Sequence, residues 1–499
     1  MRRFPRAFAL ACLAAGAARA AVTLPYLLAD HMVVQRGLPV HVWGQAAPGE
    51  AVAVSFRENT RAATADALGR WGVYLPPGEA GGPFELTVKG ANAITLQDVL
   101  VGDVWIAAGQ SNMEWPVNRA ANAAAEVAAA KHPGIRLVRA MHKVSDFAQD
   151  NLVGQMWAPC SPDSVPNFSA VGYYFGRQLY EKYGVPIGLI QTAWGGTPAD
   201  AWTSLRAISA DASLMPVFAE WARMTRDHAT ALARYDLQLR EWRAAEARAR
   251  AEGKPASEMP LPPKGPGGPW EPGVLFNAMV APITRYPIRG VVWYQGESNT
   301  APERAPVYGR LFQAMIKDWR RAWGQGDFPF LFVQLANYRA TPDSMWPELR
   351  EAQRQALVLA HTAMAAAIDI GNPDNIHPAN KQEAGRRLAL AARAVAYGEK
   401  IEYSGPLFRQ LTVEGSTVRV WFDHADSGLA ARGGAPTGFE IAASDGTFVP
   451  AAARIEGATV VLRNSALEAP VRARYGWADN PRANVYNGEG LPAAPFRSE

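Results

Sequence analysis

The chain is poor in the residues that would build a disulfide framework or a metal site. Of its 499 residues only two are cysteines, Cys12 and Cys160. Cys12 lies in a segment that we interpret as a leader, so the mature chain would keep Cys160 alone and could form no intrachain disulfide. The eight histidines include neither an HxxxH pair nor an HExxH motif. We therefore expect no bound metal and no cofactor.

The first twenty residues have the pattern of a signal peptide. Arginines at positions 2, 3 and 6 precede a short apolar stretch over 7–18, and Ala18-Arg19-Ala20 then fits a small-residue cleavage site. The apolar stretch is short for a bilayer span, which favours cleavage after Ala20 over a membrane anchor. We predict a periplasmic or secreted protein whose signal peptide is residues 1–20.

Neither sign of charge is in excess once this leader is removed. The full chain has a formal net charge of +4, and residues 1–20 contain four arginines and no acid. A mature chain that is neutral overall argues against nucleic acid or an anionic membrane surface as a partner. No later segment is long and apolar enough to cross a bilayer. The sequence carries no signal for an oligomeric state.

Hydrophobic patterning divides the mature chain into three parts. With 48% hydrophobic and 19% charged residues, the chain has an ordinary globular composition, and it is too long for one core. Residues 21–98 contain short alternating strands between turn signals, which is typical of a small β-sandwich. Residues 401–499 return to an all-β pattern, which predicts a second β domain. Residues 99–400 lie between these two.

The central part, 99–400, has the pattern of an α/β protein with a doubly wound parallel sheet, whose site lies at the carboxyl ends of the strands. Within it, an Ala-, Arg- and Glu-rich stretch and a Pro/Gly-rich loop indicate a surface insertion around 224–272. Acids interleaved with its arginines argue against a nucleic-acid-binding helix. Candidate strands cover 104–107, 135–138, 185–192, 290–294, 328–334 and 363–370, and candidate helices cover 171–183, 308–323, 349–358 and 381–397.

The most informative motif is Gly-Gln-Ser-Asn-Met-Glu-Trp over residues 109–115, directly after the apolar run 103–108. A buried strand that ends at a glycine and then presents a serine is how α/β hydrolases position a nucleophile. The glycine permits a tight turn, and free N–H groups of the following helix can face an oxyanion. Because most serines at such places are turn or cap residues, the prediction that Ser111 is a nucleophile needs a partner base.

A candidate base lies in the loop 371–378. The strand predicted over 363–370 runs into this loop, which carries Asp374 and, three residues later, His377. The Asp374 carboxylate can orient the imidazole, which can then accept the proton of Ser111. Asp369, at the end of the predicted strand, is a rival for the orienting carboxylate, and a Ser–His dyad is a further alternative.

The chain order Ser, Asp, His, with the last two nearly adjacent, matches that of SGNH (GDSL-type) hydrolases. The chain resembles their sialate O-acetylesterase family over nearly its whole mature length. The sequences GQSNM and WYQGESN are the specific ones. The resemblance implies an SGNH-hydrolase fold and a serine esterase that acts on carbohydrates. The segments that carry it are 27–36, 101–115, 191–197, 293–299, 375–378 and 475–481.

The oxyanion site is expected to combine the Ser111 backbone N–H with further donors. Gly195 and Gly196 follow a predicted strand and precede a Thr-Pro-Ala-Asp helix start, so an N–H there can point at a ligand. An ordinary strand–helix turn is the alternative. Gln295 follows the strand 290–294 and offers a neutral side-chain donor. The resemblance implies that it replaces the asparagine of other SGNH enzymes.

Further residues near these motifs are candidates for substrate binding. Sugar rings stack on aromatic faces, although large aromatics more often fill the core. Glu297 has a second interpretation as a buried structural acid. A glycosidase pair of Glu114 and Glu297 is a weaker hypothesis, because it leaves Ser111 and His377 without a role. The candidates are Asn112, Trp194, Glu297 and Trp346.

Together these features predict a carbohydrate O-acetylesterase that works through an acetyl-Ser111 intermediate on an acetylated carbohydrate substrate. The resemblance points to sialic acid esters. No arginine cluster is tied by spacing to a sialate carboxylate, so acetylated plant cell-wall polysaccharide, xylan or xyloglucan, is an alternative. A non-catalytic carbohydrate-binding protein is the alternative from another class. A lipase-like esterase would need an apolar lid that the sequence lacks.

Overall fold

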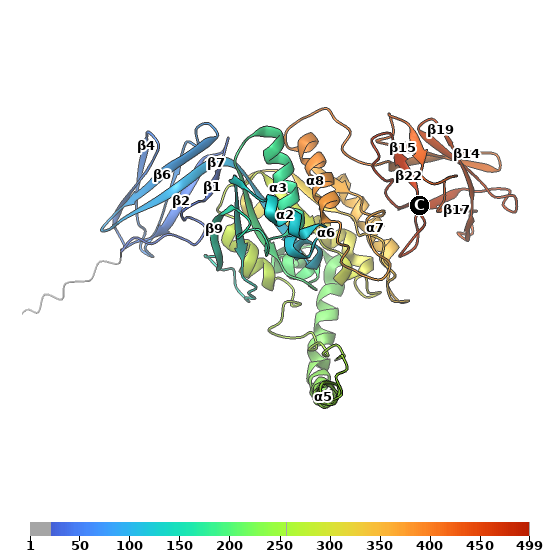
Figure 1. Cartoon of the computed structure of the whole chain (residues 1–499), viewed down its shortest axis with the longest axis horizontal. Helices are drawn as coiled ribbons and strands as arrows, with labels where there is room; N and C mark the ends of the chain where they lie inside the picture. Colours follow the sequence, from blue (N-terminus) through green and yellow to red (C-terminus); the bar gives the residue numbers. More distant parts are fainter. Residues whose placement is uncertain (1–20, 256, 499) are drawn as a thin grey trace, which may run out of the picture.

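The computed structural model describes residues 21–255 and 257–498, in which an α/β body lies between two groups of strands (Figure 1). The strands of the N-terminal part, in blue, and those of the C-terminal part, in red, lie at opposite ends of the body. The predicted signal peptide, residues 1–20, falls outside the described residues. Among the described residues, none of the helices has both the length and the apolar character needed to cross a membrane.

The body is built on a sheet whose central strands follow the order β13-β12-β11-β7-β10-β8-β9. Neighbouring strands are parallel except β8 and β9, which are antiparallel. This is the mixed α/β architecture that the alternation of strands and helices predicts. The strands are β7 (Ala93–Gly109), β8 (His132–Ala140), β9 (Gly154–Cys160), β10 (Ile187–Ala193), β11 (Gly290–Tyr294), β12 (Phe330–Val333) and β13 (Thr362–Ala365).

Helices cover both faces of this sheet because the buried side chains of β7 alternate between them. Trp105 and Ala107 share a core with α3 and α8, whereas Val104, Ile106 and Ala108 share a core with α6 and α7. The helices of the body are α1 (Ser111–Glu114), α2 (Ala123–Ala129), α3 (Ala170–Tyr183), α4 (Leu205–Ser209), α6 (Ala305–Trp323), α7 (Trp346–Gln355) and α8 (Lys381–Val395).

Strand β7 joins the body to the N-terminal strands. Its first half pairs with β6 and its second half with β10 and β11, so the predicted boundary between residues 98 and 99 falls inside one continuous strand. Strands β2 and β5 form a separate two-stranded sheet. The N-terminal strands are β1 (Val33–Gln35), β2 (Val40–Gln45), β3 (Ala51–Phe56), β4 (Asn59–Thr64), β5 (Arg70–Leu75) and β6 (Gly81–Lys89).

The C-terminal strands form antiparallel sheets in the orders β14-β15-β20-β19, β18-β17-β21-β23 and β16-β22. This part is held to the body by Arg350 of α7, which donates to the carbonyl oxygens of Ala478 and Asp479 at 2.7 and 2.8 Å. Its strands are β14 (Leu407–Glu414), β15 (Thr417–Asp423), β16 (Leu429–Ala431), β17 (Phe439–Ala442), β18 (Phe448–Pro450), β19 (Ala452–Glu456), β20 (Thr459–Arg463), β21 (Arg472–Tyr475), β22 (Val485–Asn487) and β23 (Phe496–Arg497).

A long helix, α5 (Met215–Ala251), projects away from the body and is drawn in green in Figure 1. At a rise of about 1.5 Å per residue it is about 55 Å long. It begins nine residues before position 224, where the insertion was predicted to start, because Pro216 at its first turn suits a helix start. Residues 252–272, as far as they are described, return to the body without a helix or strand.

Candidate active site

The loops that carry the sequence motifs meet at one edge of the sheet. In the strand register, Gly109 of β7 lies beside Ala193 of β10 and Tyr294 of β11, so the three strands end together. Gly109 has φ +140°, and a Cβ atom there would lie 2.2 Å from the carbonyl oxygen of Tyr294. Only glycine fits this turn, after which Ser111 opens α1.

The two glycines after β10 lie against this serine in different ways. A Cβ atom on Gly195 would lie 3.2 Å from the Cβ atom of Ser111, so the small residue keeps this approach open. Its N–H donates to Oε2 of Glu114 at 2.7 Å. Gly196 has φ +72° and open space around its Cα atom. Within residues 21–255 and 257–498, the backbone N–H groups of Ser111 and Gly196 have no hydrogen-bond acceptor.

The side chain of Asn112 ties the serine loop to two other loops. Its Nδ2 donates to Oε1 of Glu297 at 2.6 Å and to the carbonyl oxygen of Ile376 at 3.0 Å. Its Oδ1 accepts from Nζ of Lys381. Asn112 is buried, with 1% of its surface exposed. The residue after Ser111 therefore fixes the position of the residue before His377.

Two ionisable side chains, the half-buried Glu297 and the buried Lys381, flank this amide. Burial raises the pKa of the Glu297 carboxyl, and its hydrogen bond from Asn112 and the charge of Lys381 act against this. Burial lowers the pKa of the Lys381 ammonium to about 7, against the attraction of Glu297. Among the described atoms, the Oε2 of Glu297 has no hydrogen-bond partner. Asn112 thus acts as a neutral bridge between an acid and a base.

The imidazole of His377 stacks on the indole of Trp115, with ring centroids 4.8 Å apart and planes 19° apart. Trp115 follows Ser111 by four residues, about one helical turn, so the two side chains leave the same side of the chain. Burial and, second, the positive charge of Lys381 lower the pKa of His377. His377 is therefore neutral at neutral pH, as a general base must be.

Neither predicted carboxylate is bonded to this imidazole. Asp374 pairs with Arg339 at 2.8 Å, and 74% of its side chain is exposed. Asp369 pairs with Arg387 at 2.6 Å and is largely buried. Across the described part of the chain, the ring nitrogens of His377 donate no hydrogen bond to either acid, since the carboxylates accept from arginines instead. The predicted Asp374–His377 contact is thus not formed, and among the described residues the hydroxyl of Ser111 makes no hydrogen bond to His377 either.

Gln295, predicted as an oxyanion donor, has its side-chain amide bonded to neighbouring loops. Its side chain is fully buried, and Nε2 donates to the carbonyl oxygen of Thr197 at 3.3 Å and to Oδ1 of Asn299 at 2.7 Å. Its Oε1 accepts from the hydroxyl of Tyr308 at 3.1 Å. Both N–H groups are used, so in this geometry Gln295 holds the 197 and 299 loops together instead of facing an oxyanion.

The two tryptophans predicted to face substrate lie in different surroundings. Trp346 is only 3% exposed, and its indole N–H donates to the carbonyl oxygen of Ala336, so it packs in the core instead of facing the site. Trp194 is half-buried and stacks on His142, with centroids 4.3 Å apart and planes 4° apart. His142 in turn lies 2.7 Å from Oε1 of Glu114.

Sequence reasoning missed two members of this site, His142 and Lys381. His142 comes two residues after β8 ends at Ala140, which is the strand-end position where site residues are expected. Lys381 opens α8 four residues after His377. The strand-end position could have identified His142. The burial of a lysine at a helix start has no signal in the sequence.

A cavity of about 380 Å³ begins at Glu297 and Ser298 of the loop after β11. It extends to Arg304 at the start of α6 and to Lys264 and Trp270 of the loop after α5. The Lys264 ammonium lies 3.3 Å from the centre of the Trp270 ring. Within the described residues, no group of His, Cys, Asp and Glu side chains is arranged to hold a metal ion.

Known proteins resemble this chain over most of its length. The model of a family described as "carbohydrate esterase, sialic acid-specific acetylesterase" matches residues 101–228 and 268–394. A sialate O-acetylesterase of Mus musculus is 32% identical, covering 91% of this chain and 90% of that protein. A sialate O-acetylesterase of Homo sapiens is 30% identical over 77% of this chain and 72% of that protein. The crystal structure of a carbohydrate acetylesterase from Xanthomonas citri is 40% identical, covers 96% of this chain and 100% of that chain, and superposes with a TM-score of 0.82.

Proposed function

Because the chain belongs to the sialic acid-specific acetylesterase family of carbohydrate esterases, we propose that it removes O-acetyl groups from sugars with Ser111 as nucleophile and His377 as general base. It is a hydrolase that acts on a carboxylic ester of a carbohydrate. The observation that supports these roles best is the stacking of a half-buried His377 on Trp115, four residues after Ser111.

In the first half of the reaction, Oγ of Ser111 attacks the carbonyl carbon of the acetyl ester and His377 accepts the hydroxyl proton. The tetrahedral oxyanion faces the free N–H groups of Ser111 and Gly196, which carry no other acceptor among the described residues. When the intermediate collapses, the sugar oxygen leaves with the proton from His377. The acetyl group stays on Ser111.

In the second half, His377 accepts a proton from water, and the resulting hydroxide attacks the acetyl-Ser111 carbonyl. Collapse of the second intermediate releases acetate, and Ser111 recovers its proton from His377. The stack on Trp115 fixes the ring plane of His377, which is the task that an orienting carboxylate performs in a triad. We therefore propose a dyad of Ser111 and His377. The two acids have structural roles in this proposal: Asp374 pairs with Arg339 of another loop, and Asp369 pairs with Arg387 of α8.

The two acids near the site do not have the environments that a glycosidase needs. Glu114 accepts from the Gly195 N–H and lies against His142, and Glu297 accepts from Asn112. Both accept hydrogen bonds that hold loops in place, although Oε2 of Glu297 keeps no partner among the described atoms. A pair of Glu114 and Glu297 would also leave Ser111 and His377 without a role. This favours the esterase over the pair of Glu114 and Glu297.

We propose that the cavity beside Glu297 holds the sugar that bears the acetyl group. An aromatic ring, that of Trp270, lines it together with charges of both signs: the cations Arg223, Lys264 and Arg304 and the acids Glu220, Glu297, Glu303 and Asp343. The sialic acid esters named for the relatives are the first candidate substrate. Acetylated xylan or xyloglucan is the second candidate, since Arg304 is already paired with Asp200 at 2.6 Å.

Three finer expectations belong to this proposal. The body is an SGNH hydrolase, because Ser111 and His377 follow the chain order of that superfamily at the carboxyl edge of a parallel sheet. Residues 1–20 are a signal peptide, so the mature enzyme acts in the periplasm or outside the cell. The N-terminal and C-terminal strands form β domains beside the catalytic body.

The experiment that tests the function is acetate release by the mature protein and by Ser111→Ala. The panel holds O-acetylated sialic acid, acetylated xylan, acetylated xyloglucan and 4-nitrophenyl acetate. We expect release from at least one sugar, and its loss in the variant. Release that continues in Ser111→Ala would contradict the role of the serine, and no release from any member by wild type would favour the carbohydrate-binding alternative.

A further inference from the structure

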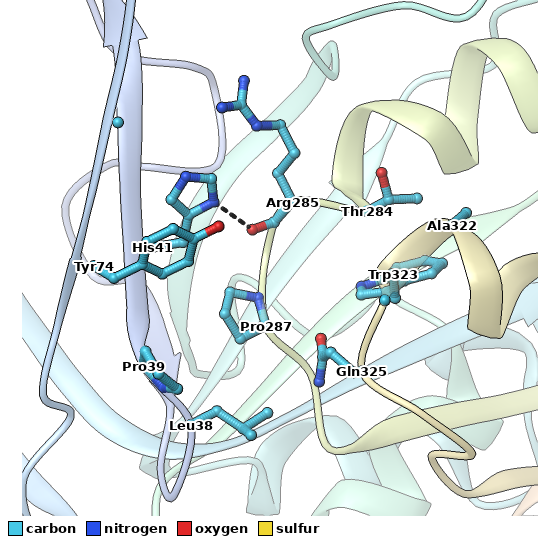
Figure 2. Close-up of a pocket in the computed structure, with 12 residues that line it drawn as sticks. Leu38, Pro39, His41, Tyr74, Thr284, Arg285, Pro287, Ala322, Trp323 and Gln325 are labelled. Atoms are coloured by element: carbon cyan, nitrogen blue, oxygen red, sulfur yellow. Dashed lines mark hydrogen bonds between the residues drawn. The ribbon is translucent and has the colours of Figure 1, made fainter.

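A second cavity lies between the N-terminal strands and the α/β body (Figure 2). Its volume is about 670 Å³, within the range of roughly 300–1,000 Å³ that ligand sites occupy, and domain junctions are common places for such sites. His41 of β2 and Tyr74 of β5 form one wall. Residues 284–287 and the end of α6 at Trp323 form the other.

This cavity and the candidate active site lie at opposite ends of the parallel strands. Residues 284–287 come before β11 begins at Gly290, and Trp323 comes before β12 begins at Phe330. Ser111, by contrast, follows the carboxyl end of β7, which is parallel to β11. At a rise of about 3.3 Å per residue, the five residues of β11 alone separate the two ends by roughly 16 Å. The cavity is therefore no part of the acyl-transfer site.

Two stacked rings, those of His41 and Tyr74, stand in the wall made by the N-terminal strands, and the buried Trp43 ring lies behind them. His41 and Tyr74 are paired across β2 and β5, with ring centroids 4.3 Å apart and planes 10° apart. Trp43 stacks on the other side of His41 at 4.8 Å. Tyr74 is 62% exposed, although its stack on His41 holds the ring in place. Figure 2 shows its hydroxyl directed toward the space between the two walls. An ordered, accessible aromatic ring is thus presented to the cavity.

Several polar groups of the cavity have donors or acceptors that make no hydrogen bond among the described residues. His41 Nδ1 lies 3.1 Å from the carbonyl oxygen of Arg285, which can only accept, so Nδ1 carries the proton and Nε2 is an acceptor. Burial lowers the pKa of His41, which keeps the ring neutral. Among residues 21–255 and 257–498, the Tyr74 hydroxyl and the Arg285 guanidinium have no hydrogen-bond partner; the guanidinium lies over the Trp43 ring.

This lining selects a class of ligand. No Asp or Glu lines the cavity, so it lacks the ligands of a hard metal ion and the partner of a cationic ligand. Leu38, Pro39 and Pro287 supply apolar surface beside the neutral hydroxyl and imidazole groups, and Arg285 adds one positive charge. Sugar units have the matching surface, with C–H faces that pack on rings and hydroxyls that both donate and accept.

We infer that the cavity between β2, β5 and residues 284–287 is a non-catalytic binding site for a glycan segment. A polysaccharide bound there is held close to the enzyme, which raises the local concentration of its acetyl groups at Ser111 without any new contact at the catalytic centre. The site increases the rate of hydrolysis of polymeric substrates and does not affect the hydrolysis of small esters. It stands independently of the catalytic residues proposed above.

The test uses an array of unesterified oligosaccharides, neutral and acidic, so that binding is measured without catalysis. The mature protein is compared with Tyr74→Ala, with Tyr74→Phe and with the control Trp421→Ala, an aromatic residue of β15 that is 37% exposed. We expect wild type to bind at least one glycan class, Tyr74→Ala to bind it about tenfold more weakly, a loss of about 1.4 kcal/mol, and Trp421→Ala to bind it unchanged. Tyr74→Phe keeps the ring stack and loses only the hydroxyl, so its loss should be smaller.

A kinetic comparison completes the test. On the acetylated polysaccharide that wild type accepts, Tyr74→Ala should raise KM severalfold and leave kcat unchanged, and on 4-nitrophenyl acetate both constants should stay as in wild type. The inference is overturned if wild type binds no glycan, or if Tyr74→Ala keeps full affinity while thermal unfolding shows it to be folded. Loss of binding in Trp421→Ala alone would move the site to the C-terminal strands and also overturn it.

Discussion

The side-chain amide of Asn112 donates a hydrogen bond of 3.0 Å to the carbonyl oxygen of Ile376. These residues are 264 positions apart in the chain, and each is next to a member of the proposed dyad, Ser111 and His377. One buried side chain thus links the loop of the proposed nucleophile to the loop of the proposed base. The stack of His377 on Trp115 sets the orientation of the base.

We predict that Asn112→Ala lowers kcat by roughly ten- to a hundredfold, because the loss of hydrogen bonds to charged groups costs about 1.5–3 kcal/mol and frees the two loops. KM for a small ester should change little. The matched control is Asn118→Ala, an exposed asparagine of the same segment whose Nδ2 bonds only to Asn167. Equal kinetics of the two variants would show that Asn112 does not position the dyad.

The pH profile should report the environment of His377. The base works only when neutral, and burial together with the charge of Lys381 lowers its pKa below the ordinary value of 6.5. The acid limb of kcat/KM should therefore have its midpoint below pH 6.5. In Lys381→Gln, which removes the charge but keeps a donor for Asn112, the midpoint should move up.

The control for this shift is Lys317→Gln, an exposed lysine on α6, which should leave the midpoint where it is in wild type. A purely structural role of Lys381 would lower the rate at all pH values without moving the midpoint. That result would contradict the electrostatic influence of Lys381 on the base.

We predict that Gln295 contributes more to folding stability than to the acyl-transfer reaction. Gln295→Ala removes the hydrogen bonds that the Thr197 carbonyl oxygen and Asn299 Oδ1 accept in a buried part of the protein. This loss should lower the free energy of unfolding by about 1–3 kcal/mol. The exposed Gln410 of β14 gives the control variant Gln410→Ala, with no measurable change. A loss of kcat of about a hundredfold or more with unchanged unfolding would instead identify Gln295 as a direct oxyanion donor.

The two glycines after β10 should respond to alanine in opposite ways. In Gly195→Ala the new methyl group meets the Cβ atom of Ser111 at 3.2 Å, so kcat should fall while stability changes little. In Gly196→Ala the space is open, but the backbone φ of +72° disfavours a side chain by about 1–2 kcal/mol. Stability should fall and the N–H should stay in place. Thermal unfolding and kcat of both variants, side by side, test this, and the reverse pattern would contradict it.

Much of the body was predictable because its signals are local. The apolar run before Gly109 predicted a buried strand, and the GQSN and QGESN motifs were expected at strand ends that the register does bring together. The helices over 171–183 and 308–323 were predicted to within three residues of their observed starts, since their amphipathic spacing is strong.

The parts that sequence reasoning did not supply depend on contacts between distant segments. Asp374 has the spacing of an orienting acid, yet Arg339 from another loop holds its carboxylate. The strand predicted to run to Ile370 ends at Ala365, and Asp369 then pairs with Arg387 of α8. Trp346 was a candidate for facing the substrate, and it packs in the core instead. Which partner a polar side chain finds is decided by packing, which one sequence does not reveal.

The central claim is that Ser111 carries the acetyl group between two steps driven by His377. Its most direct test is mass spectrometry of the mature enzyme after rapid acid quenching during turnover of 4-nitrophenyl acetate, an activated ester for which acylation is fast. We predict one acetyl group on the peptide that contains Ser111, and none in Ser111→Ala. An acetyl group found on another residue during turnover would contradict the role of Ser111. So would full activity of Ser111→Ala together with no acetylated peptide.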